Sequence, residues 1–327
     1  MRIVLCYPVT DAHVEQIRRS APQCEVIDAG QQRIDELLPS ADIFIGHAKV
    51  PVDWDRVLRA KRLKMIQSSA AGLDHCLVPG VIDSDIPVAS ASGLFAPQVA
   101  EQTFALLFGL LRKVKTFIDA ETRREFIRRP TDDLRGKTVG IVGLGGNGRT
   151  IARALGPWDV KIIATDYYPV RCPDEVSALL PAGELETLLR QSDIVIATLP
   201  LNAHTKSLFD ADRFAQMQTG VCFINVARGG VVVEGDLVAA LDSGQVGSAG
   251  LDVTEIEPLH TDSPLWLRDN VLISPHVGAQ SARRVDDTTD LACENLKRFF
   301  AGQRLVNQVD KQLGFPHPDD SWRMRNE

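Results

Sequence analysis

The feature of this sequence that most constrains its fold is a glycine-rich turn between two apolar segments. Residues 138–142 are apolar and β-branched, which is typical of a buried strand, and residues 150–155 have the pattern of a helix. Between them stands Gly143-x-Gly145-x-x-Gly148. The first glycine permits a tight turn, the second lets a pyrophosphate approach the backbone, and the third lets the helix pack closely on the strand. The pattern therefore predicts a strand, a phosphate-binding turn and a helix.

The residues around this turn predict a dinucleotide site. The helix that begins at Gly146 and Asn147 would present free N–H groups and the positive end of its dipole to phosphates. A second apolar strand follows and ends at Asp166, about 20 residues beyond the turn, where a carboxylate binds the adenosine ribose hydroxyls. That negative charge would repel a 2′-phosphate, so it favours NAD over NADP. The alternative is an ordinary glycine turn with Asp166 as a solvated strand end.

Composition and charge narrow the class of protein. The chain has 327 residues, 44% of them hydrophobic, which suits two domains of ordinary size with sizeable cores. The net charge of −7 argues against a nucleic-acid partner. The cysteines form no C-x-x-C pair and no metal-binding spacing, and no signal peptide or membrane-spanning apolar stretch is visible. We therefore expect a soluble, cytoplasmic protein with no metal, no nucleic acid and no membrane association.

Strand and helix patterns alternate through most of the chain, which predicts parallel sheets covered by helices. In the first part we expect strands at 3–6, 24–27, 42–45, 64–67 and 87–89. In the second part we expect strands at 138–142, 160–165, 193–198, 221–225, 247–251 and 271–273.

A long apolar helix is predicted over residues 97–117, between the two parts. It is apolar almost all round, so it must be buried, either inside a domain or in a dimer interface. A final helix over residues 281–301 has the length to return to the first part. We therefore predict a domain made of residues 1–97 and 282–327, with a dinucleotide-binding domain of residues 98–281 inserted in it, and a homodimer formed through helix 97–117.

Three polar residues stand in loops that follow strands of the second part: Arg228, Glu257 and His276. Ligands bind at the carboxyl ends of strands in open α/β sheets. An arginine fork matches a carboxylate bidentately, and a histidine can exchange a proton with a hydroxyl near neutral pH. Glu257 would hydrogen-bond the other ring nitrogen, orient the ring and favour its charged form. This set predicts hydride transfer between a nicotinamide and an α-hydroxy acid.

Each of these residues also has an ordinary structural interpretation. Arg228 alone could be a surface cation, Glu257 a solvated carboxylate and His276 a satisfied core histidine. Their order downstream of a dinucleotide motif favours the joint functional interpretation.

At this point the chain resembles the D-isomer-specific 2-hydroxyacid dehydrogenases over nearly its whole length. The matching motifs are Gly143-x-Gly145-x-x-Gly148, Thr198-Leu-Pro200, Asn225-Val-Ala-Arg-Gly-Gly230, Leu251-Asp-Val253 with Glu257-Pro258, and Pro275-His-Val-Gly278. The resemblance implies a Rossmann-type cofactor domain inserted in a smaller, flavodoxin-like parallel α/β substrate domain. It also implies an NAD-dependent enzyme similar to glyoxylate/hydroxypyruvate reductases or phosphoglycerate dehydrogenases.

The resemblance assigns roles to further residues. Cofactor contacts are implied at Gly143, Gly145, Gly146, Asn147, Gly148, Asp166, Leu199, Pro200, Val226, Ala227, Asp252, Gly278 and Ala279. Asp252 is expected to bind the nicotinamide carboxamide. The loop Ser69–Asp74 is similar to the family's substrate loop, so the N–H groups of Ala71 and Gly72 are expected to meet the substrate carboxylate, with Lys49 nearby.

The chain departs from the family pattern at a few positions. Asn147 stands where the family often has a β-branched apolar residue, and Gln102 where several members have histidine. The loop 47–51 lacks the arginine that phosphoglycerate dehydrogenases use on the substrate phosphate, although Lys49 could serve as a point charge. We therefore favour a small unphosphorylated 2-keto acid as substrate.

Two alternatives remain open. Formate and phosphite dehydrogenases share the fold, but the first carry glutamine in place of Glu257 and the second need a lysine near Ala71. A binding protein that senses the dinucleotide, like the corepressors of this fold, is compatible with the same residues. Such corepressors carry long disordered flanks, which this chain does not show.

Overall fold

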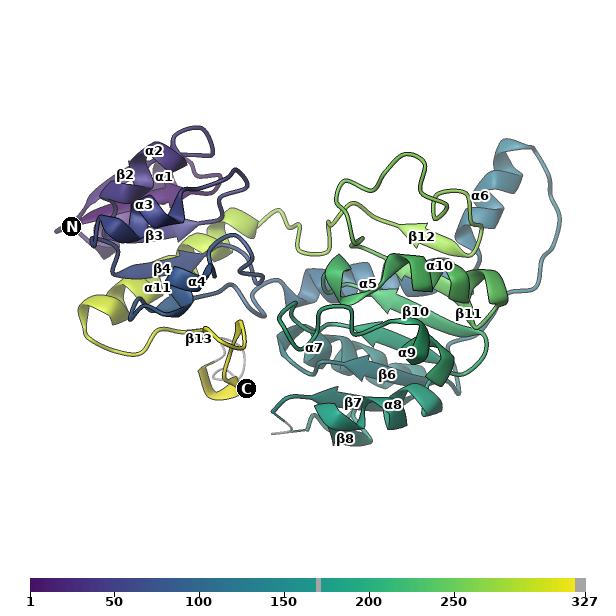
Figure 1. Cartoon of the computed structure of the whole chain (residues 1–327). Helices are drawn as coiled ribbons and strands as arrows, with labels where there is room; N and C mark the ends of the chain where they lie inside the picture. Colours follow the sequence, from purple (N-terminus) through teal and green to yellow (C-terminus); the bar gives the residue numbers. More distant parts are fainter. Residues whose placement is uncertain (169–171, 321–327) are drawn as a thin grey trace. The chain divides into compact units, whose positions relative to one another are not determined.

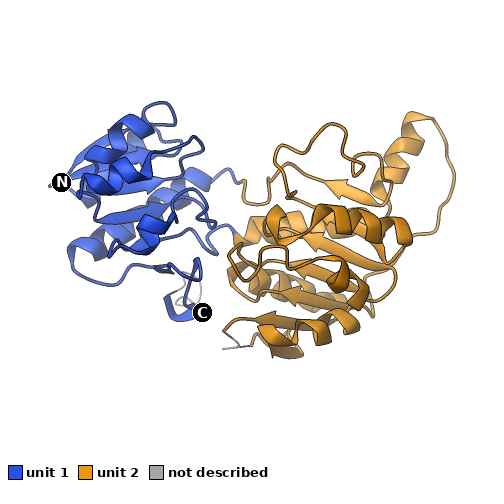
Figure 2. Ribbon diagram, in the orientation of Figure 1, with its two compact units in different colours: residues 1–95, 281–327 blue, residues 96–280 orange. Residues whose placement is uncertain are grey.

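The computed structural model describes residues 1–168 and 172–320, and this part of the chain divides into two compact units (Figures 1 and 2). Unit 1 comprises Met1–Phe95 and Ser281–Glu327, and unit 2 comprises Ala96–Gln280. Each unit is built on its own parallel sheet.

Unit 1 is a parallel sheet in the order β2-β1-β3-β4-β5, with helices on both faces. Its elements are β1 Arg2–Cys6, α1 Asp11–Ser20, β2 Glu25–Asp28, α2 Ile34–Leu37, η1 Leu38–Ser40, β3 Ile43–Gly46, α3 Trp54–Arg59, β4 Met65–Ser68, α4 Pro79–Ile82, β5 Val88–Ala89, α11 Arg284–Phe300, β13 Val309–Asp310, β14 Phe315–Pro316 and η5 Pro318–Asp320. The order is that of flavodoxin-like sheets.

Two cores hold unit 1 together, one on each face of its sheet. The first lies beneath α2, α3 and α4 and includes Phe44 and Trp54, whose rings meet edge to face with centroids 6.3 Å apart. The second lies beneath α1 and α11 and includes Ile17 and Leu296, both fully buried. The C-terminal helix α11 therefore packs against the sheet formed by the N-terminal segment.

Unit 2 is a parallel sheet in the order β12-β11-β10-β9-β6-β7-β8. Its elements are α5 Ala96–Leu111, α6 Val114–Thr122, β6 Thr138–Val142, α7 Gly146–Leu155, η2 Gly156–Trp158, β7 Lys161–Asp166, β8 Ala178–Pro181, η3 Ala182–Glu184, α8 Leu185–Gln191, β9 Ile194–Ala197, α9 Ala211–Gln216, β10 Val221–Asn225, η4 Gly229–Val231, α10 Glu234–Ser243, β11 Val246–Leu251 and β12 Val271–Ile273. Helices α5 and α7 cover one face, and α8, α9 and α10 cover the other.

The strand order of unit 2 is that of a doubly wound dinucleotide fold. The chain leaves the sheet centre at β6, runs outward through β7 and β8, and then returns to begin again at β9 on the other side of β6. Ligands bind where the order reverses in this way, at the carboxyl ends of the strands. The predicted fold class, a Rossmann-type sheet together with a smaller flavodoxin-like sheet, is confirmed.

The predicted single helix over 97–117 is wrong. Helix α5 ends at Leu111, and Lys113 adopts a left-handed conformation (φ 51°, ψ 42°) before α6 begins. The backbone N–H of Asp132 donates to the Leu111 carbonyl, and Arg112 reaches the carbonyl of Asp132, so the chain returning from α6 caps the end of α5. Most of the apolar surface of α5 packs inside unit 2 against α7 and the sheet.

We predict that Leu107→Ala lowers the free energy of unfolding by about 2–5 kcal/mol, because Leu107 is fully buried in the core between α5 and the sheet. Glu101, on the exposed side of the same helix, provides the control: Glu101→Ala should change it by no more than about 0.5 kcal/mol. Urea unfolding followed by far-UV circular dichroism measures both. Equal, small effects from the two substitutions would show that α5 is not buried as described.

Candidate active site

The glycine-rich turn joins β6 to α7 at the centre of the sheet in unit 2. Gly143 has φ +96°, a conformation that favours glycine. A Cβ on Gly148 would lie 2.2 Å from the carbonyl oxygen of Gly143, so only glycine allows α7 to approach the turn this closely. At Gly145 an added Cβ would meet nothing within 4 Å. The turn is thus tight on its protein side and open beside its second glycine.

Helix α7 begins directly at this open position. Its N-cap is Gly145, which makes no side-chain cap hydrogen bond, and its first turn contains Gly146, Asn147 and Gly148. The amides of a first helical turn have no acceptor within the helix, and they carry the positive end of its dipole. This arrangement suits the phosphates of a dinucleotide.

Asp166 ends β7 beside the turn and is tied to it. Its Oδ2 accepts a hydrogen bond from the Leu144 N–H (2.6 Å), and its Oδ1 accepts one from the Tyr168 N–H (3.0 Å). Burial raises the pKa of the Asp166 carboxyl above its usual value, although these amides and the charge of Arg149 act in the opposite direction. The sequence suggested a ribose contact here; the structure adds that this carboxylate also fastens the glycine-rich turn.

Two further predicted cofactor segments lie at the carboxyl ends of neighbouring strands. The segment Thr198–Pro200 follows β9 and packs on the turn: Thr198 Oγ1 donates to the Gly143 carbonyl (2.5 Å), and a Cβ on Gly143 would lie 3.1 Å from the Leu199 Cα. Val226 and Ala227 follow β10 and are both buried. The parallel register of β6, β9 and β10 therefore brings these residues to one edge of the sheet.

Arg228 continues the loop after β10, and its neighbour Gly229 explains how the loop comes close to the next one. A Cβ on Gly229 would lie 1.7 Å from the carbonyl oxygen of Thr254, so no other residue could allow this approach. Asn225 holds the loop from within, since its side-chain amide donates to the Arg228 carbonyl and its oxygen accepts from the Ala227 N–H. Gly229 belongs to a motif quoted for the family resemblance, but the sequence alone assigns no role to Gly229 or to Thr254.

His276 and Glu257 form a hydrogen-bonded pair. The imidazole Nδ1 lies 2.8 Å from the Glu257 Oε2, and both side chains are partly exposed, at 43% and 39%. Burial is the largest influence on Glu257 and would raise the pKa of its carboxyl. The hydrogen bond and charge of His276, the Thr254 N–H and the charge of Arg228 outweigh it, so the pKa lies below its usual 4.5. The charge of Arg228 thus reaches the same carboxylate that holds the histidine.

Asp252 is 3% exposed and is hydrogen-bonded to the loop that carries His276. Its carboxylate accepts hydrogen bonds from the backbone N–H groups of Val277 (3.0 Å) and Gly278 (2.8 Å) and from the Ser274 hydroxyl (2.6 Å). The His276 N–H donates to the Asp252 backbone carbonyl (2.7 Å). Asp252 therefore organises the loop after β12, a role beyond the cofactor contact that the family resemblance implies. Nothing in the sequence pointed to a role for Ser274.

The predicted substrate residues Ala71, Gly72 and Lys49 belong to unit 1, in the loops after β4 and β3. Ala71 and Lys49 are exposed and Gly72 is half-buried. Within residues 1–168 and 172–320, the N–H groups of Ala71 and Gly72 donate to no acceptor. The Lys49 N–H donates to the Gln31 side chain (2.7 Å), which positions its loop.

No group of three or more histidine, cysteine or acidic side chains is arranged to hold a metal ion in the part of the chain that the structure describes. No described helix combines the length and apolar character needed to cross a membrane.

Comparisons with known proteins show the family to which the chain is similar. A family model described as "D-isomer specific 2-hydroxyacid dehydrogenase, NAD binding domain" matches residues 104–278. A glyoxylate reductase of Thermofilum pendens is 33% identical over 273 residues, covering 80% of this chain and 79% of its own. A hydroxypyruvate reductase of Thermotoga maritima is 31% identical over 314 residues, covering 93% and 96%.

Solved structures extend the likeness to the fold. The NADPH-dependent glyoxylate/hydroxypyruvate reductase of Sinorhizobium meliloti, solved with NADP and sulfate, superposes with a TM-score of 0.81 and 29% identity, over 96% of this chain and 99% of the other. The motifs, both sheets and these matches lead to one conclusion: the chain belongs to the D-isomer-specific 2-hydroxyacid dehydrogenase family, whose members are oxidoreductases acting on CH–OH groups.

Proposed function

We propose that this protein transfers a hydride between NAD(H) and a small D-2-hydroxy acid or 2-keto acid. The observation that carries the proposal is the contact between His276 Nδ1 and Glu257 Oε2, together with Arg228, whose charge acts on the same carboxylate. A proton-exchanging ring, an anion that orients it and a cation for a carboxylate are the groups that this chemistry requires.

Each of these residues has a distinct role. Glu257 engages Nδ1 of His276, so Nε2 is the nitrogen that exchanges a proton with the substrate oxygen. In reduction the protonated ring donates its proton to the carbonyl oxygen, which becomes the hydroxyl. In oxidation the neutral ring accepts the proton of that hydroxyl. The Arg228 guanidinium binds the substrate carboxylate bidentately. We also propose that the N–H groups of Ala71 and Gly72 bind the substrate carboxylate.

The glycine-rich turn and the strand ends next to it are the residues that hold the dinucleotide. The open space beside Gly145 and the start of α7 fit a pyrophosphate, and Asp166 fits the ribose hydroxyls. When bound, the nicotinamide supplies or accepts the hydride. The remainder of this site is lined by residues at the neighbouring strand ends: Leu199, Pro200, Val226, Ala227, Asp252, Gly278 and Ala279.

We favour NAD over NADP because Asp166 places a carboxylate where a 2′-phosphate would lie, and Tyr167 and Tyr168, which follow it, supply no cation. Arg149 is a cation whose charge acts on Asp166, but it is buried, with 7% exposure. NADP is the competing choice, since the Sinorhizobium relative was solved with it.

The substrate we propose is small and unphosphorylated, such as glyoxylate or hydroxypyruvate. The loop 47–51 offers Lys49 but no arginine fork for a phosphate, and similar proteins are named for these two keto acids. A panel of 2-keto acids with NADH and NADPH, followed at the nicotinamide absorbance, tests the proposal. Saturable turnover of glyoxylate or hydroxypyruvate supports it. Tight NADH binding without turnover of any keto acid would favour the dinucleotide-sensing alternative.

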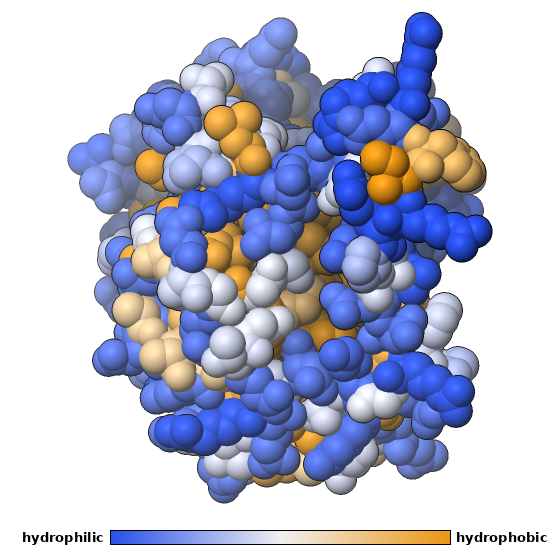
Figure 3. All heavy atoms as spheres, turned by 90° about the vertical axis from the view of Figure 1, so that its right-hand side faces the viewer, coloured by the Kyte–Doolittle hydropathy of each residue, from blue (hydrophilic) through white to orange (hydrophobic). Residues whose placement is uncertain are grey.

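We also propose a homodimer, but through a different surface from the one expected. Helix α6 and residues 123–131, here called the arm, project from unit 2 (Figure 1). The arm exposes Phe126 fully and Ile118 and Ile127 by half, and its residues line most of an open cavity of about 840 Å³. Figure 3 looks onto the side of unit 2 from which α6 projects, where hydrophobic side chains line a hollow and others protrude among charged ones.

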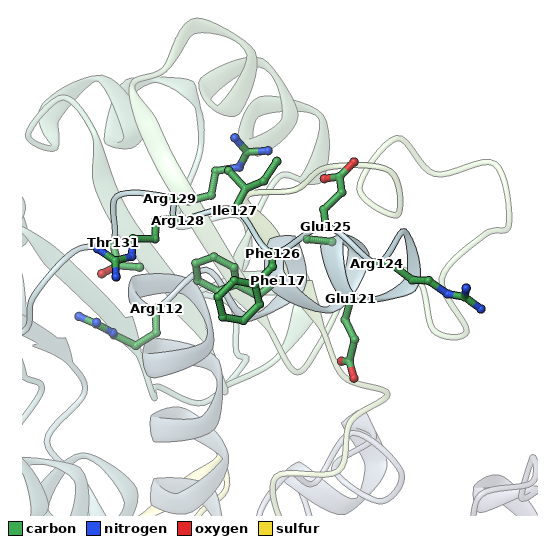
Figure 4. A pocket seen from close by; sticks show the side chains of 11 residues that line it. Arg112, Phe117, Glu121, Arg124, Glu125, Phe126, Ile127, Arg128, Arg129 and Thr131 are labelled. Carbon is green, nitrogen blue, oxygen red and sulfur yellow. The ribbon is translucent and has the colours of Figure 1, made fainter.

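A second copy of the chain is the occupant that suits this surface. Phe117 and Phe126 contribute rings to the cavity lining, while the charged ends of Glu121 and Arg124 point away from them (Figure 4). One segment thus carries both an exposed apolar side chain and a hollow lined by aromatic rings and charged side chains, which a two-fold interface could bring together. Exposed apolar surface of this kind marks an interaction site.

We expect Glu257→Gln to shift the pH dependence of the reaction. With its lowered pKa, Glu257 is ionised at neutral pH, and its charge is lost only as the pH falls through that value. Glutamine keeps the shape and removes the charge, so the imidazolium is less stabilised. The alkaline limb of kcat/KM for reduction, and the acid limb for oxidation, should both move down by about one pH unit. Glu255→Gln, an exposed neighbour, should leave both limbs in place, and unmoved limbs in Glu257→Gln would remove Glu257 from the pair.

Cofactor choice can be tested with Asp166→Asn. Asparagine can still accept the hydrogen bond from Leu144 but carries no negative charge to repel a 2′-phosphate. We expect the ratio of kcat/KM with NADH to that with NADPH to fall by about tenfold, equivalent to roughly 1.4 kcal/mol. A wild-type enzyme that already prefers NADPH would contradict the proposal.

The dimer should respond to Phe126→Glu. A charge at this exposed apolar position would have to be buried in the interface, so the dimer should dissociate at micromolar concentration. Light scattering of the wild type should give about twice the chain mass of 35.8 kDa. Gln23→Glu places the same charge on the surface of unit 1 and should leave the dimer intact. A monomeric wild type would end the dimer proposal without affecting the catalytic one.

A further inference from the structure

A chain of hydrogen bonds runs from helix α5 to the loop that carries His276. The Gln102 side-chain amide donates to the Ser274 hydroxyl (Nε2 to Oγ, 2.8 Å). The Ser274 hydroxyl donates to Asp252 (Oγ to Oδ1, 2.6 Å). The Asp252 carboxylate in turn accepts hydrogen bonds from the N–H groups of Val277 and Gly278, which follow His276 in the sequence. The chain therefore links residues before and after His276 through one buried carboxylate.

The chemistry of the groups fixes the direction of this chain. The Asp252 Oδ1 accepts the Val277 N–H and lies 2.6 Å from the Ser274 Oγ, so the single proton of the Ser274 hydroxyl goes to Asp252. The same hydroxyl can then only accept from its other neighbour, so position 102 must supply a donor. Gln102 supplies one with its NH₂ group. An acceptor at this position would face the serine oxygen without a proton between them.

His276 needs such support because its backbone is unusual. Its φ is +53°, in the left-handed region that residues with a Cβ seldom adopt. Such conformations persist where surrounding contacts determine them, and they are concentrated at functional sites. Here the contacts are the His276 N–H to the Asp252 carbonyl and the two amides held by the Asp252 carboxylate. The same conformation places Nδ1 within 2.8 Å of Glu257.

Packing around Gly278 leaves little freedom for an alternative arrangement. A Cβ added to Gly278 would lie 2.8 Å from the Asp252 Oδ2 and 3.7 Å from the Gln102 Cβ. The loop that carries His276 thus packs against Asp252 and Gln102, two of the hydrogen-bonded residues. A shift of either side chain changes the space available to the loop.

We propose that Gln102 and Ser274 are positioning residues for the reaction: they fix the Asp252 carboxylate and, through it, the backbone conformation that aims His276. This inference rests on the proposed function, in which His276 exchanges the proton with substrate. In the proposed function Arg228 binds the substrate carboxylate and His276 exchanges the proton, and neither Gln102 nor Ser274 has such a role. Their loss should therefore reduce the rate of the chemical step more than the binding of the keto acid.

Paired variants test this proposal. Gln102→Glu is nearly isosteric and replaces the donor with an acceptor, whereas Gln102→His restores an N–H donor. Ser274→Ala removes the hydroxyl, whereas Ser274→Thr keeps it. If a disruptive variant does not fold, as judged by circular dichroism, Gln102→Met is measured in its place. Methionine is similar in size to glutamine and has no hydrogen-bond donor.

The readout is the split between kcat and KM for glyoxylate reduction by NADH. We expect Gln102→Glu and Ser274→Ala to lower kcat by about tenfold to a hundredfold, as a misplaced catalytic group does, with KM changed by less than about threefold. Gln102→His and Ser274→Thr should restore most of kcat. His276→Ala is measured beside them, and its full activity would mean that the proposed function itself has failed.

Two results would overturn the positioning role while leaving the proposed function intact. One is wild-type kcat in folded Gln102→Glu and Ser274→Ala when His276→Ala is inactive. The other is a loss of kcat in Gln102→His and Ser274→Thr as large as in the disruptive pair, because the hydrogen bond would then not be the cause.

Discussion

The site of unit 2 depends on one constraint, the parallel pairing of its central strands. Strands β6, β9, β10, β11 and β12 all run in the same direction, so their following loops emerge at one edge of the sheet. The glycine-rich turn, the arginine loop, the glutamate loop and the histidine loop are far apart in sequence and meet there for this reason. An antiparallel arrangement of any of these strands would send its loop to the opposite edge.

Within this frame, close backbone approach and buried carboxylates set the finer geometry. Gly148 lets helix α7 meet the turn, and Gly229 lets the arginine loop meet the carbonyl of Thr254. Asp166 ties the turn to β7, and Asp252 ties the histidine loop to β11. Each carboxylate accepts hydrogen bonds from backbone N–H groups, which fix the position of the neighbouring loop. The loops are therefore held by their own backbone and not by long, mobile side chains.

Much of this could be predicted from the sequence because the signals are local. Strands β6, β10 and β12 match the predicted ranges since each is an unbroken apolar, β-branched run. Strand β8 was missed: Ala178–Pro181 is short, only partly buried and ends in proline. The break between α5 and α6 was missed because it depends on a left-handed Lys113 and on a cap from Asp132, a contact that apolar periodicity does not contain.

The candidate site likewise contains some residues that the sequence could indicate and others that it could not. Arg228, Glu257 and His276 could be selected because their residue types and strand-end positions suit one chemistry. Ser274 and Gln102 could not, because serine and glutamine are common in loops and helices and only the three-dimensional contact joins them. The second role of Asp166 likewise appears only when the Leu144 amide is seen to donate to it.

The central claim is that His276 is the proton source of a hydride-transfer site, and a rescue experiment tests it most directly. In single-turnover reduction of glyoxylate by bound NADH, the rate of His276→Ala should be about 10²–10⁴-fold lower than that of the wild type. Its affinity for NADH should stay near that of the wild type. Added imidazole should restore part of the rate in proportion to its protonated fraction. A His276→Ala enzyme that reduces glyoxylate at the wild-type rate would contradict the account.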